Sequence, residues 1–249
     1  MPLSPMQIEE ILRSNRDHDC SGYGKDGVCV RIAAIADLPS RFGEFQIVGF
    51  WNNRDDKEHV ALVHGDVAGQ EAVPIRVHSE CLTGDVLGSL RCDCRDQLEA
   101  ALKLLGGMER GVLLYLRQEG RGIGLINKIR AYSLQDLGFD TVEANLALGF
   151  RDEERDFAVA AHMIRSLQIR SIALMTNNPY KITELEKHGV RIASRLPHQL
   201  PPNPHNRFYL QTKTTKMGHY LDVDAAGAGA SIKPLSDEQG EKLAGDGTP

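Results

Sequence analysis

The stretch Val112-Leu113-Leu114-Tyr115-Leu116-Arg117-Gln118-Glu119-Gly120-Arg121-Gly122-Ile123-Gly124 decides the fold class. An unbroken apolar run predicts a buried strand, and the glycines and arginines that follow predict a turn that opens a helix. A buried strand that leads directly into a helix is typical of an α/β sheet, and such sheets bind ligands at these turns.

Downstream of this stretch, short apolar runs alternate with stripes of helical spacing. The pattern predicts helices over 125–137, 157–167 and 182–187, and strands over 171–175 and 190–193. In the first of these helices we expect Ile126, Ile129 and Leu134 to face inward and Gly138 to end the helix. Strands that alternate with helices pair in parallel.

Upstream, the pattern is that of β-strands. Alternating apolar side chains predict an antiparallel meander of four segments, 28–32, 45–50, 59–67 and 74–78, and a helical stripe follows over 98–105. We therefore predict an α/β fold of three layers with a mixed sheet. Its first half has antiparallel strands, and its second half has strand-helix-strand units.

Composition and charge exclude several classes of protein. The chain has 249 residues and a net charge of −5, which argues against a broad nucleic-acid surface. It has neither an apolar run long enough for a membrane span nor a signal peptide, and its thiols are typical of a reduced, cytoplasmic protein. We expect an N-terminal arm over 1–30, one main domain over 31–222 and a flexible C-terminal tail over 223–249.

Three cysteines lie close together in the run from His78 to Cys94: Cys81, Cys92 and Cys94. Three thiolates without a fourth protein ligand are typical of a catalytic zinc site, which leaves one position open for water. If His78 were a fourth ligand, the site would be closed and structural. A third interpretation is that the cysteines are ordinary buried thiols.

Two further segments indicate an anionic ligand. The turn 117–124 has more glycine and arginine than a structural turn needs, although it matches neither the dinucleotide fingerprint nor the P-loop. In the segment 176–181, Lys181 falls in the first turn of a helix, where a cation is unfavourable unless an anion lies nearby. The charged segment 149–156 fits equally well a solvated helix start or a functional role.

Taken together, the motifs resemble those of GTP cyclohydrolase II, the zinc enzyme that opens riboflavin biosynthesis. The matching stretches are residues 76–85, 89–94, 117–121, 127–132, 140–145, 155–157, 176–179 and 216–219. The resemblance implies hydrolysis of GTP to formate, pyrophosphate and 2,5-diamino-6-ribosylamino-4(3H)-pyrimidinone 5′-phosphate. It also implies a homodimer, and we expect a monofunctional chain because about 30 residues precede the domain.

The resemblance also assigns roles to individual residues. One zinc ion per chain would be held by Cys81, Cys92 and Cys94, and Mg²⁺ would accompany the triphosphate. Tyr132 would assist at the guanine ring, and Glu153 and Arg155 would act in pyrophosphate release. The residues expected to bind GTP are Arg76, Val77, His78, Ser79, Glu80, Gln97, Glu119, Gly120, Arg121, Thr141, Thr176 and Lys181.

The chain departs from the family pattern at two positions. Glu153 stands where the family usually has Asp as a proton acceptor, with Asp152 beside it, and Leu116 stands where His is frequent. For Arg155 the family role is covalent attack on the α-phosphorus, but a protonated guanidinium is a better clamp than nucleophile. Two other functions stay open: a paralogue whose product retains the formyl group, and a catalytically silent zinc protein that binds guanine nucleotides.

Overall fold

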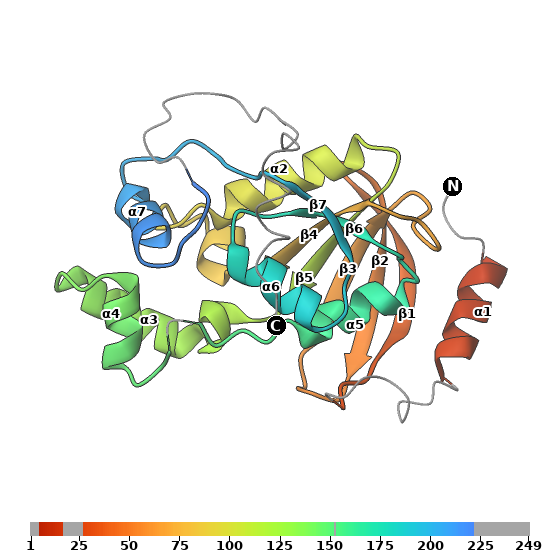
Figure 1. Cartoon of the computed structure of the whole chain (residues 1–249), viewed down its shortest axis with the longest axis horizontal. Coiled ribbons are helices and arrows are strands. Elements are labelled where there is room, and N and C mark those ends of the chain that lie inside the picture. Colours follow the sequence, from red (N-terminus) through yellow and green to blue (C-terminus); the bar gives the residue numbers. More distant parts are fainter. Residues whose placement is uncertain (1–4, 17–26, 152, 222–249) are drawn as a thin grey trace, which may run out of the picture.

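The computed structural model describes residues 5–16, 27–151 and 153–221, and a seven-stranded mixed sheet runs through this part of the chain (Figure 1). The strands are β1 (Val30–Ser40), β2 (Gly43–Asn52), β3 (His59–His64), β4 (Val73–Ser79), β5 (Gly111–Leu116), β6 (Ile172–Met175) and β7 (Ile192–Leu196). Their order across the sheet is β1-β2-β3-β5-β4-β6-β7. The predicted mixed sheet is confirmed.

The pairing shows where the predicted meander is right and where it is wrong. Strands β1, β2, β3 and β5 pair in antiparallel fashion, whereas β5, β4, β6 and β7 pair in parallel. The fourth predicted segment, β4, is therefore not a neighbour of β3, because β5 lies between them. Alternation along a strand reports which face is buried but not which strand lies next to it.

Helices cover both faces of the sheet, as the three-layer prediction requires. The helices are α1 (Pro5–Arg16), α2 (Cys94–Gly106), α3 (Leu125–Asp136), α4 (Thr141–Ala147), α5 (Ala158–Ser166), α6 (Pro179–Lys187) and α7 (Arg207–Thr215). On one face, Leu105 of α2 packs with Leu113 of β5. On the other face, α5 and α6 pack on Leu114, which points the opposite way from its neighbour in β5.

Helix α3 corrects one expectation about side-chain orientation. Ile126 and Ile129 are exposed and Leu134 is half-buried, whereas Ala131 is the buried side chain of this helix. The reason is that α3 packs on α4 and on the turn Glu119–Gly122, beyond the end of the sheet (Figure 1). The predicted end of the helix is confirmed within two residues of Gly138.

Outside the sheet, α1 packs on the edge strand β1. Its Ile11 and Leu12 contact the core, and Asn15 Oδ1 accepts a hydrogen bond from Ile32 N at 3.1 Å. Several predicted features lie outside the described residues. They are Asp152, the C-terminal tail from residue 223, and the part of the N-terminal arm that contains Cys20. Cys29 is buried and disulfide-bonded, so the expectation that the cysteines of this chain are reduced is wrong for Cys29.

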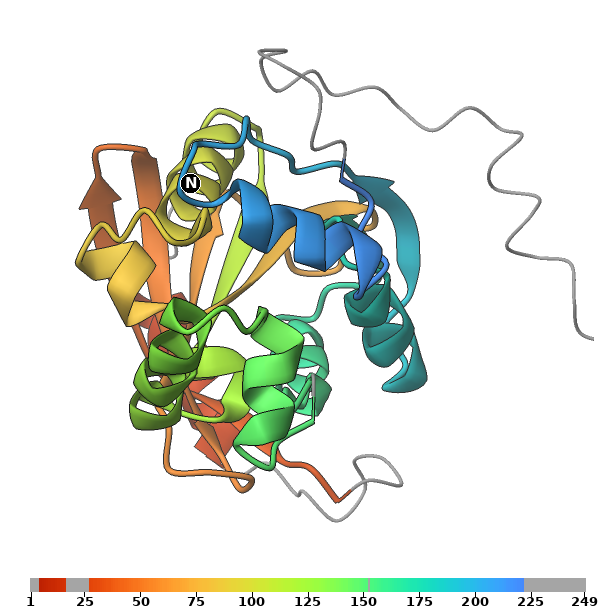
Figure 2. The same ribbon diagram turned by 90° about the vertical axis from the view of Figure 1, so that its left-hand side faces the viewer.

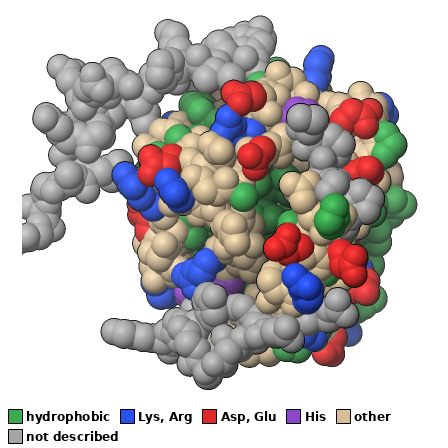
Figure 3. Space-filling model, turned by 90° about the vertical axis from the view of Figure 1, so that its right-hand side faces the viewer, with side chains coloured by type: hydrophobic (Ala, Val, Ile, Leu, Met, Phe, Trp, Pro, Cys, Tyr) green, Lys and Arg blue, Asp and Glu red, His purple; other side chains and the backbone are tan. Residues whose placement is uncertain are grey.

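The described surface carries both signs of charge. On the face shown in Figure 3, Lys and Arg side chains are interspersed with Asp and Glu side chains. No helix in the described ranges is both long enough and apolar enough to cross a membrane.

Candidate active site

A cavity of about 170 Å³ lies where the parallel strands β4, β5 and β6 reach their carboxyl ends. The segments that follow these strands begin with Glu80, Arg117 and Thr176, and parallel pairing brings them to one edge of the sheet. This is the edge at which α/β sheets bind ligands. The motifs that follow three separate strands in the sequence therefore meet at one site.

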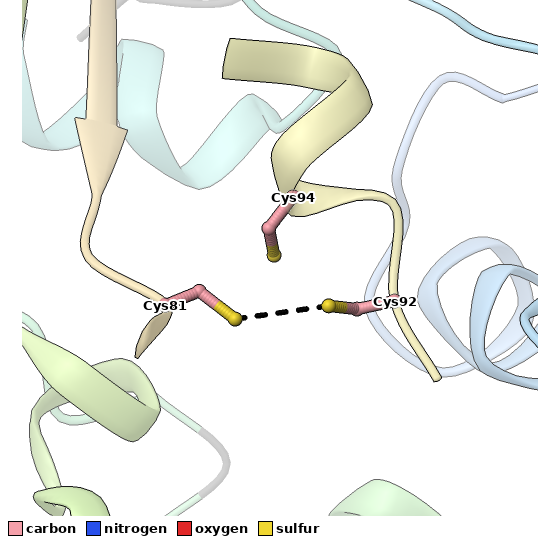
Figure 4. Close-up of side chains that lie close together, drawn as sticks. All are labelled: Cys81, Cys92 and Cys94. Atoms are coloured by element: carbon pink, nitrogen blue, oxygen red, sulfur yellow. Dashed lines mark hydrogen bonds between the residues drawn. The ribbon is translucent and has the colours of Figure 1, made fainter. Parts of the chain in front are cut away.

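The three predicted thiols line this cavity. Cys81 follows β4, Cys92 lies in the loop before α2, and Cys94 is the first residue of α2 (Figure 4). Their sulfurs lie within 4.8 Å of one another, and Cys81 Sγ and Cys92 Sγ are 3.7 Å apart. Tetrahedral zinc–thiolate bonds of about 2.3 Å would place sulfurs about 3.8 Å apart. The three cysteines therefore form a cluster that could hold a metal ion.

His78 is not part of this cluster. Its Nε2 lies 3.0 Å from Asp85 Oδ2, and its ring stacks on Tyr115. The same carboxylate accepts hydrogen bonds from the Tyr115 hydroxyl at 2.8 Å and from Cys81 N at 3.0 Å. His78 thus helps to order the loop that carries Cys81, and the interpretation of a closed site with His78 as fourth ligand is not supported.

Gly84 provides the space that the thiol cluster occupies. A Cβ atom at this position would lie 2.8 Å from Cys92 Sγ and 3.1 Å from Cys81 Sγ. The Gly84 amide also points at the cluster and donates to Cys81 Sγ at 3.4 Å. The glycine in this loop therefore allows the backbone to approach the sulfurs closely.

Lys128 of α3 brings a positive charge to the cluster. Its Nζ lies 3.0 Å from Cys81 Sγ and 2.7 Å from Glu119 Oε1. Hydrogen bonds from the Cys92 and Cys94 thiols, together with the Lys128 ammonium, hold the pKa of Cys81 well below its ordinary value. The lowered pKa favours the thiolate form of Cys81, which is the form that binds metal.

Tyr132 lies one helical turn from Lys128 and faces the same cluster. Its hydroxyl is 3.2 Å from Thr83 Oγ1, which in turn is 3.6 Å from Cys81 Sγ. Burial raises the pKa of Tyr132, so the phenol stays protonated and can donate a hydrogen bond.

Arg76, which is buried, and Gln97, which is half-buried, both line the cavity and contact each other. Arg76 donates to Gln97 Oε1 at 2.5 Å and to Met175 O at 3.0 Å. The third nitrogen of this guanidinium, Nε, is buried and has no hydrogen-bond partner within the described part of the chain. A buried donor without a partner is costly unless a ligand satisfies it.

Arg155 and Glu153 form an ion pair beside the cavity. Arg155 Nε donates to Glu153 Oε1 at 2.6 Å, and a second contact joins Arg155 to Glu153 Oε2. Burial alone would raise the pKa of Glu153, but the Arg155 guanidinium lowers it, and the net shift is downward. Glu153 therefore stays ionised and fixes the guanidinium of Arg155, which lines the cavity.

Lys181 enters the cavity from the start of α6. Its Nζ donates to Val77 O at 2.6 Å. Burial, together with the nearby Arg76 and Arg155, lowers its pKa well below the ordinary value for lysine. Lys181 is therefore repelled by the two guanidinium groups, and an anion bound between them would relieve that repulsion.

The structure brings nearly all predicted site residues together. The cavity is lined by Arg76, His78, Ser79, Glu80, Cys81, Cys92, Cys94, Gln97, Glu119, Gly120, Arg121, Tyr132, Thr141, Arg155, Thr176 and Lys181. Two predicted residues, Val77 and Glu153, do not line the cavity. The Val77 side chain lies in the hydrophobic core, and Glu153 contacts Arg155, which does line the cavity.

Other lining residues were not assigned a role from the sequence. They include Arg91, Lys128, Asn145, Asn177, Asn178, His198, Tyr209, Lys213 and His219. All of them except His198, Tyr209 and Lys213 lie within the stretches that resemble the family, so position in a motif is a signal for those six. Lys213 and Tyr209 lie in α7, a helix absent from the sequence prediction, and nothing in their local sequence indicates the cavity.

Comparison with known proteins identifies the family. A sequence model of GTP cyclohydrolase II matches residues 31–197. The chain belongs to the GTP cyclohydrolase II family. It is 57% identical over 184 residues to GTP cyclohydrolase-2 of Picrophilus torridus, a match that covers 74% of this chain and 95% of that protein. GTP cyclohydrolase-2 of Aeromonas hydrophila is 55% identical over 190 residues, with 76% and 96% covered.

A longer relative matches over part of its length. Riboflavin biosynthesis protein RibBA of Bacillus subtilis is 57% identical over 185 residues, which are 74% of this chain and 46% of that protein. The predicted family and the predicted enzyme class, a hydrolase, are therefore confirmed. The α/β domain described above is the fold that carries the family's motifs in this chain.

Proposed function

We propose that this enzyme hydrolyses GTP, with zinc, to formate, pyrophosphate and 2,5-diamino-6-ribosylamino-4(3H)-pyrimidinone 5′-phosphate, the first step of riboflavin biosynthesis. The observation that carries the proposal is that the thiol cluster and a group of cationic side chains line the same cavity. Hydrolysis at the guanine ring and release of pyrophosphate need these two kinds of chemistry within one site.

Cys81, Cys92 and Cys94 would hold one zinc ion per chain. When bound, zinc would supply a Lewis acid that lowers the pKa of water toward about 7. The spacing of the sulfurs, the room that Gly84 provides and the thiolate character of Cys81 support this assignment. Lys128 would offset the negative charge of the three thiolates.

The cationic side chains would bind the triphosphate together with Mg²⁺. Arg121, Arg155 and Lys181 line the cavity from three different segments. Guanidinium groups contact phosphate oxygens through two parallel hydrogen bonds, and lysine adds a point charge. A metal-bridged triphosphate would satisfy these cations and lower their mutual repulsion.

Two side chains are suited to specific steps. The Tyr132 hydroxyl, held protonated near the cluster, would donate a hydrogen bond to the guanine ring as it opens. Arg155, fixed by Glu153, would stabilise charge that develops on the α-phosphate when pyrophosphate leaves. A clamp needs a guanidinium that stays protonated, and the ion pair with Glu153 favours that form.

A homodimer that acts in the cytoplasm completes the proposal. Apolar side chains are exposed on and near α3, among them Ile126, Ile129 and Leu137. Apolar side chains grouped on one exposed helix favour contact with another protein surface, and a second copy of the chain would cover them. Sedimentation at several protein concentrations tests this, and a monomer throughout would contradict it.

One assay distinguishes the proposal from both other candidate functions. The purified enzyme is incubated with GTP and Mg²⁺, and formate and pyrophosphate are measured in the same samples. The proposed reaction releases the two in equal amounts. Pyrophosphate without formate would indicate a product that retains the formyl group, and neither product, with GTP bound, would indicate a silent guanine-nucleotide-binding protein.

A further inference from the structure

Residues 207–221 form one wall of the cavity, although the match to the family model ends at residue 197. The lining side chains of this segment are Tyr209, Lys213, His219 and Leu221. Helix α7 lies between α2 and the α3–α4 pair in both ribbon views (Figures 1 and 2). A segment that the family model does not cover thus contributes directly to the site, and its residues 216–219 are among the stretches that resemble the family.

The segment is tied to three different parts of the cavity rim. Lys213 Nζ lies 3.2 Å from Asp93 Oδ1, and Tyr220 N donates to Asn177 O at 2.9 Å. The Lys216 ammonium pairs with carboxylates at the start of α4. These contacts join the thiol loop, the turn after β6 and the α3–α4 pair, so the position of residues 207–221 affects all three.

The contact between Lys213 and Asp93 is the buried one. The two side chains are 11% and 6% exposed, whereas Lys216 is 44% exposed. Asp93 stands between Cys92 and Cys94, so its contact with Lys213 attaches the backbone between the two thiols to α7. Removing one partner of a buried ion pair leaves an uncompensated charge in this loop.

A chain of hydrogen bonds leads from Asp93 to the residues expected to bind GTP. Gln97 Nε2 donates to Asp93 Oδ2 at 2.5 Å, and Gln97 Oε1 accepts from Arg76. The amide of Gln97 is therefore held in one orientation by an acceptor on one side and a donor on the other. Lys213 acts at the start of this chain because it fixes the other oxygen of Asp93.

We propose that Lys213 is a positioning residue of the active site, because it fixes the Asp93 carboxylate. Through Asp93 it holds Cys92 and Cys94 at the spacing that a metal ion needs. Through the same carboxylate it holds Gln97 in the orientation that substrate needs. The part that concerns substrate rests on the proposed hydrolysis of GTP, whereas the part that concerns metal rests only on the metal site proposed at the three cysteines. Mutation of a residue that hydrogen-bonds near a metal ligand typically lowers metal affinity about 10- to 100-fold.

The test uses cobalt as a spectroscopic probe in the full-length chain. Parent, Lys213→Met, Lys213→Arg and Gln211→Met are stripped of metal and titrated with Co²⁺, while thiolate-to-cobalt charge-transfer absorption is recorded. Gln211 is an exposed residue of the same helix and serves as the control. We expect Lys213→Met to bind Co²⁺ about 10-fold more weakly than the parent and to shift the charge-transfer band. Lys213→Arg should recover most of the affinity for Co²⁺. Gln211→Met should match the parent in affinity and in the band.

The outcomes separate this inference from the proposed function. A parental cobalt band and affinity in Lys213→Met would overturn the positioning role, as would a loss of thermal stability alone. If Lys213→Met does not fold, Asp93→Asn tests the same contact, and a parental band in that variant overturns the role. Absence of GTP hydrolysis in the parent would instead overturn the proposed function, and the cobalt result would still decide the role of Lys213.

Discussion

The Lys128 ammonium lies 3.0 Å from the Cys81 sulfur, although 47 positions separate the two residues in the sequence. The same ammonium donates a hydrogen bond to Glu119 Oε1 at 2.7 Å. Glu119 Oε2 accepts a hydrogen bond from Leu82 N at 2.6 Å. Burial alone would lower the pKa of Lys128, but Glu119 and the Cys81 thiolate raise it, and the net shift is upward. Helix α3 therefore places a permanent positive charge against the thiol cluster.

Replacement of Lys128 should weaken metal binding. Three thiolates with Zn²⁺ carry a net negative charge, which the ammonium offsets. We expect Lys128→Met to lower zinc affinity about 10- to 100-fold, measured by competition with a chromophoric chelator. Lys103→Met, at an exposed position of α2, should leave the affinity unchanged. Equal affinity in Lys128→Met and the parent would contradict this role.

Gly84→Ala should distort the thiol cluster. The new methyl group would lie 2.8 Å from Cys92 Sγ, closer than real Cβ contacts allow. We expect loss of bound metal and a cost of about 1–3 kcal/mol in the free energy of unfolding. Gly107→Ala is the matched control, because its Cβ would meet its nearest atoms at 3.5 Å or more. Denaturant unfolding and metal analysis check both variants, and full zinc occupancy in Gly84→Ala would show that the loop adapts.

The site should distinguish GTP from ATP. Glu80 and Arg76 lie beside the thiol cluster, and buried polar groups that pair with guanine would be left without partners by adenine. We expect kcat/KM for ATP to be lower than for GTP by about 10⁴-fold. Similar values for the two nucleotides would show that the base is not recognised through these groups.

The Glu153–Arg155 pair should control pyrophosphate release. Glu153→Gln removes the charge that fixes Arg155 and should cut pyrophosphate release substantially, whereas Glu153→Asp keeps the carboxylate and should retain most of that release.

Arg155→Lys should retain part of the activity, because a point charge still stabilises phosphate. Near-complete loss in Arg155→Lys, with a trappable nucleotidyl-enzyme in the parent, would instead support the covalent role.

The same pair should make stability depend on pH. Because the pKa of Glu153 is lowered in the folded state, its contribution to stability is present above the unfolded pKa, near 4.5, and is lost as pH falls through the folded value. The thermal midpoint of Glu153→Gln should therefore lie below that of the parent at pH 7, and the gap should narrow below pH 4.5. A gap that stays constant from pH 7 to pH 3 would contradict this.

The sequence predicted elements best where packing follows a local pattern. The strand 112–116 is buried on both faces and was predicted from its apolar run alone. Ile126 and Ile129 follow the same helical spacing as core residues but face solvent, because α3 packs on α4 rather than on the sheet. Periodicity identifies an apolar stripe, but it does not identify what covers it.

The same distinction, between local patterns and long-range packing, applies to the residues of the site. The thiols were predicted because their spacing itself indicates metal chemistry, whereas Lys213 contacts Asp93 across 120 positions and has no local signal. Helix α4 was missed, although Asp140 and Glu143 form a capping box that its sequence displays. Contacts that depend on how distant segments pack could be obtained only from the structure.

The most direct test of the account measures zinc and formate together in the parent and in Cys92→Ser. The cluster of Cys81, Cys92 and Cys94 is the feature on which the proposed reaction depends. We predict one zinc ion per chain in the parent, with formate and pyrophosphate released in equal amounts from GTP. Cys92→Ser should stay folded, lose zinc and release no formate. Full zinc occupancy in Cys92→Ser, or formate release from a parent that contains no zinc, would contradict the account.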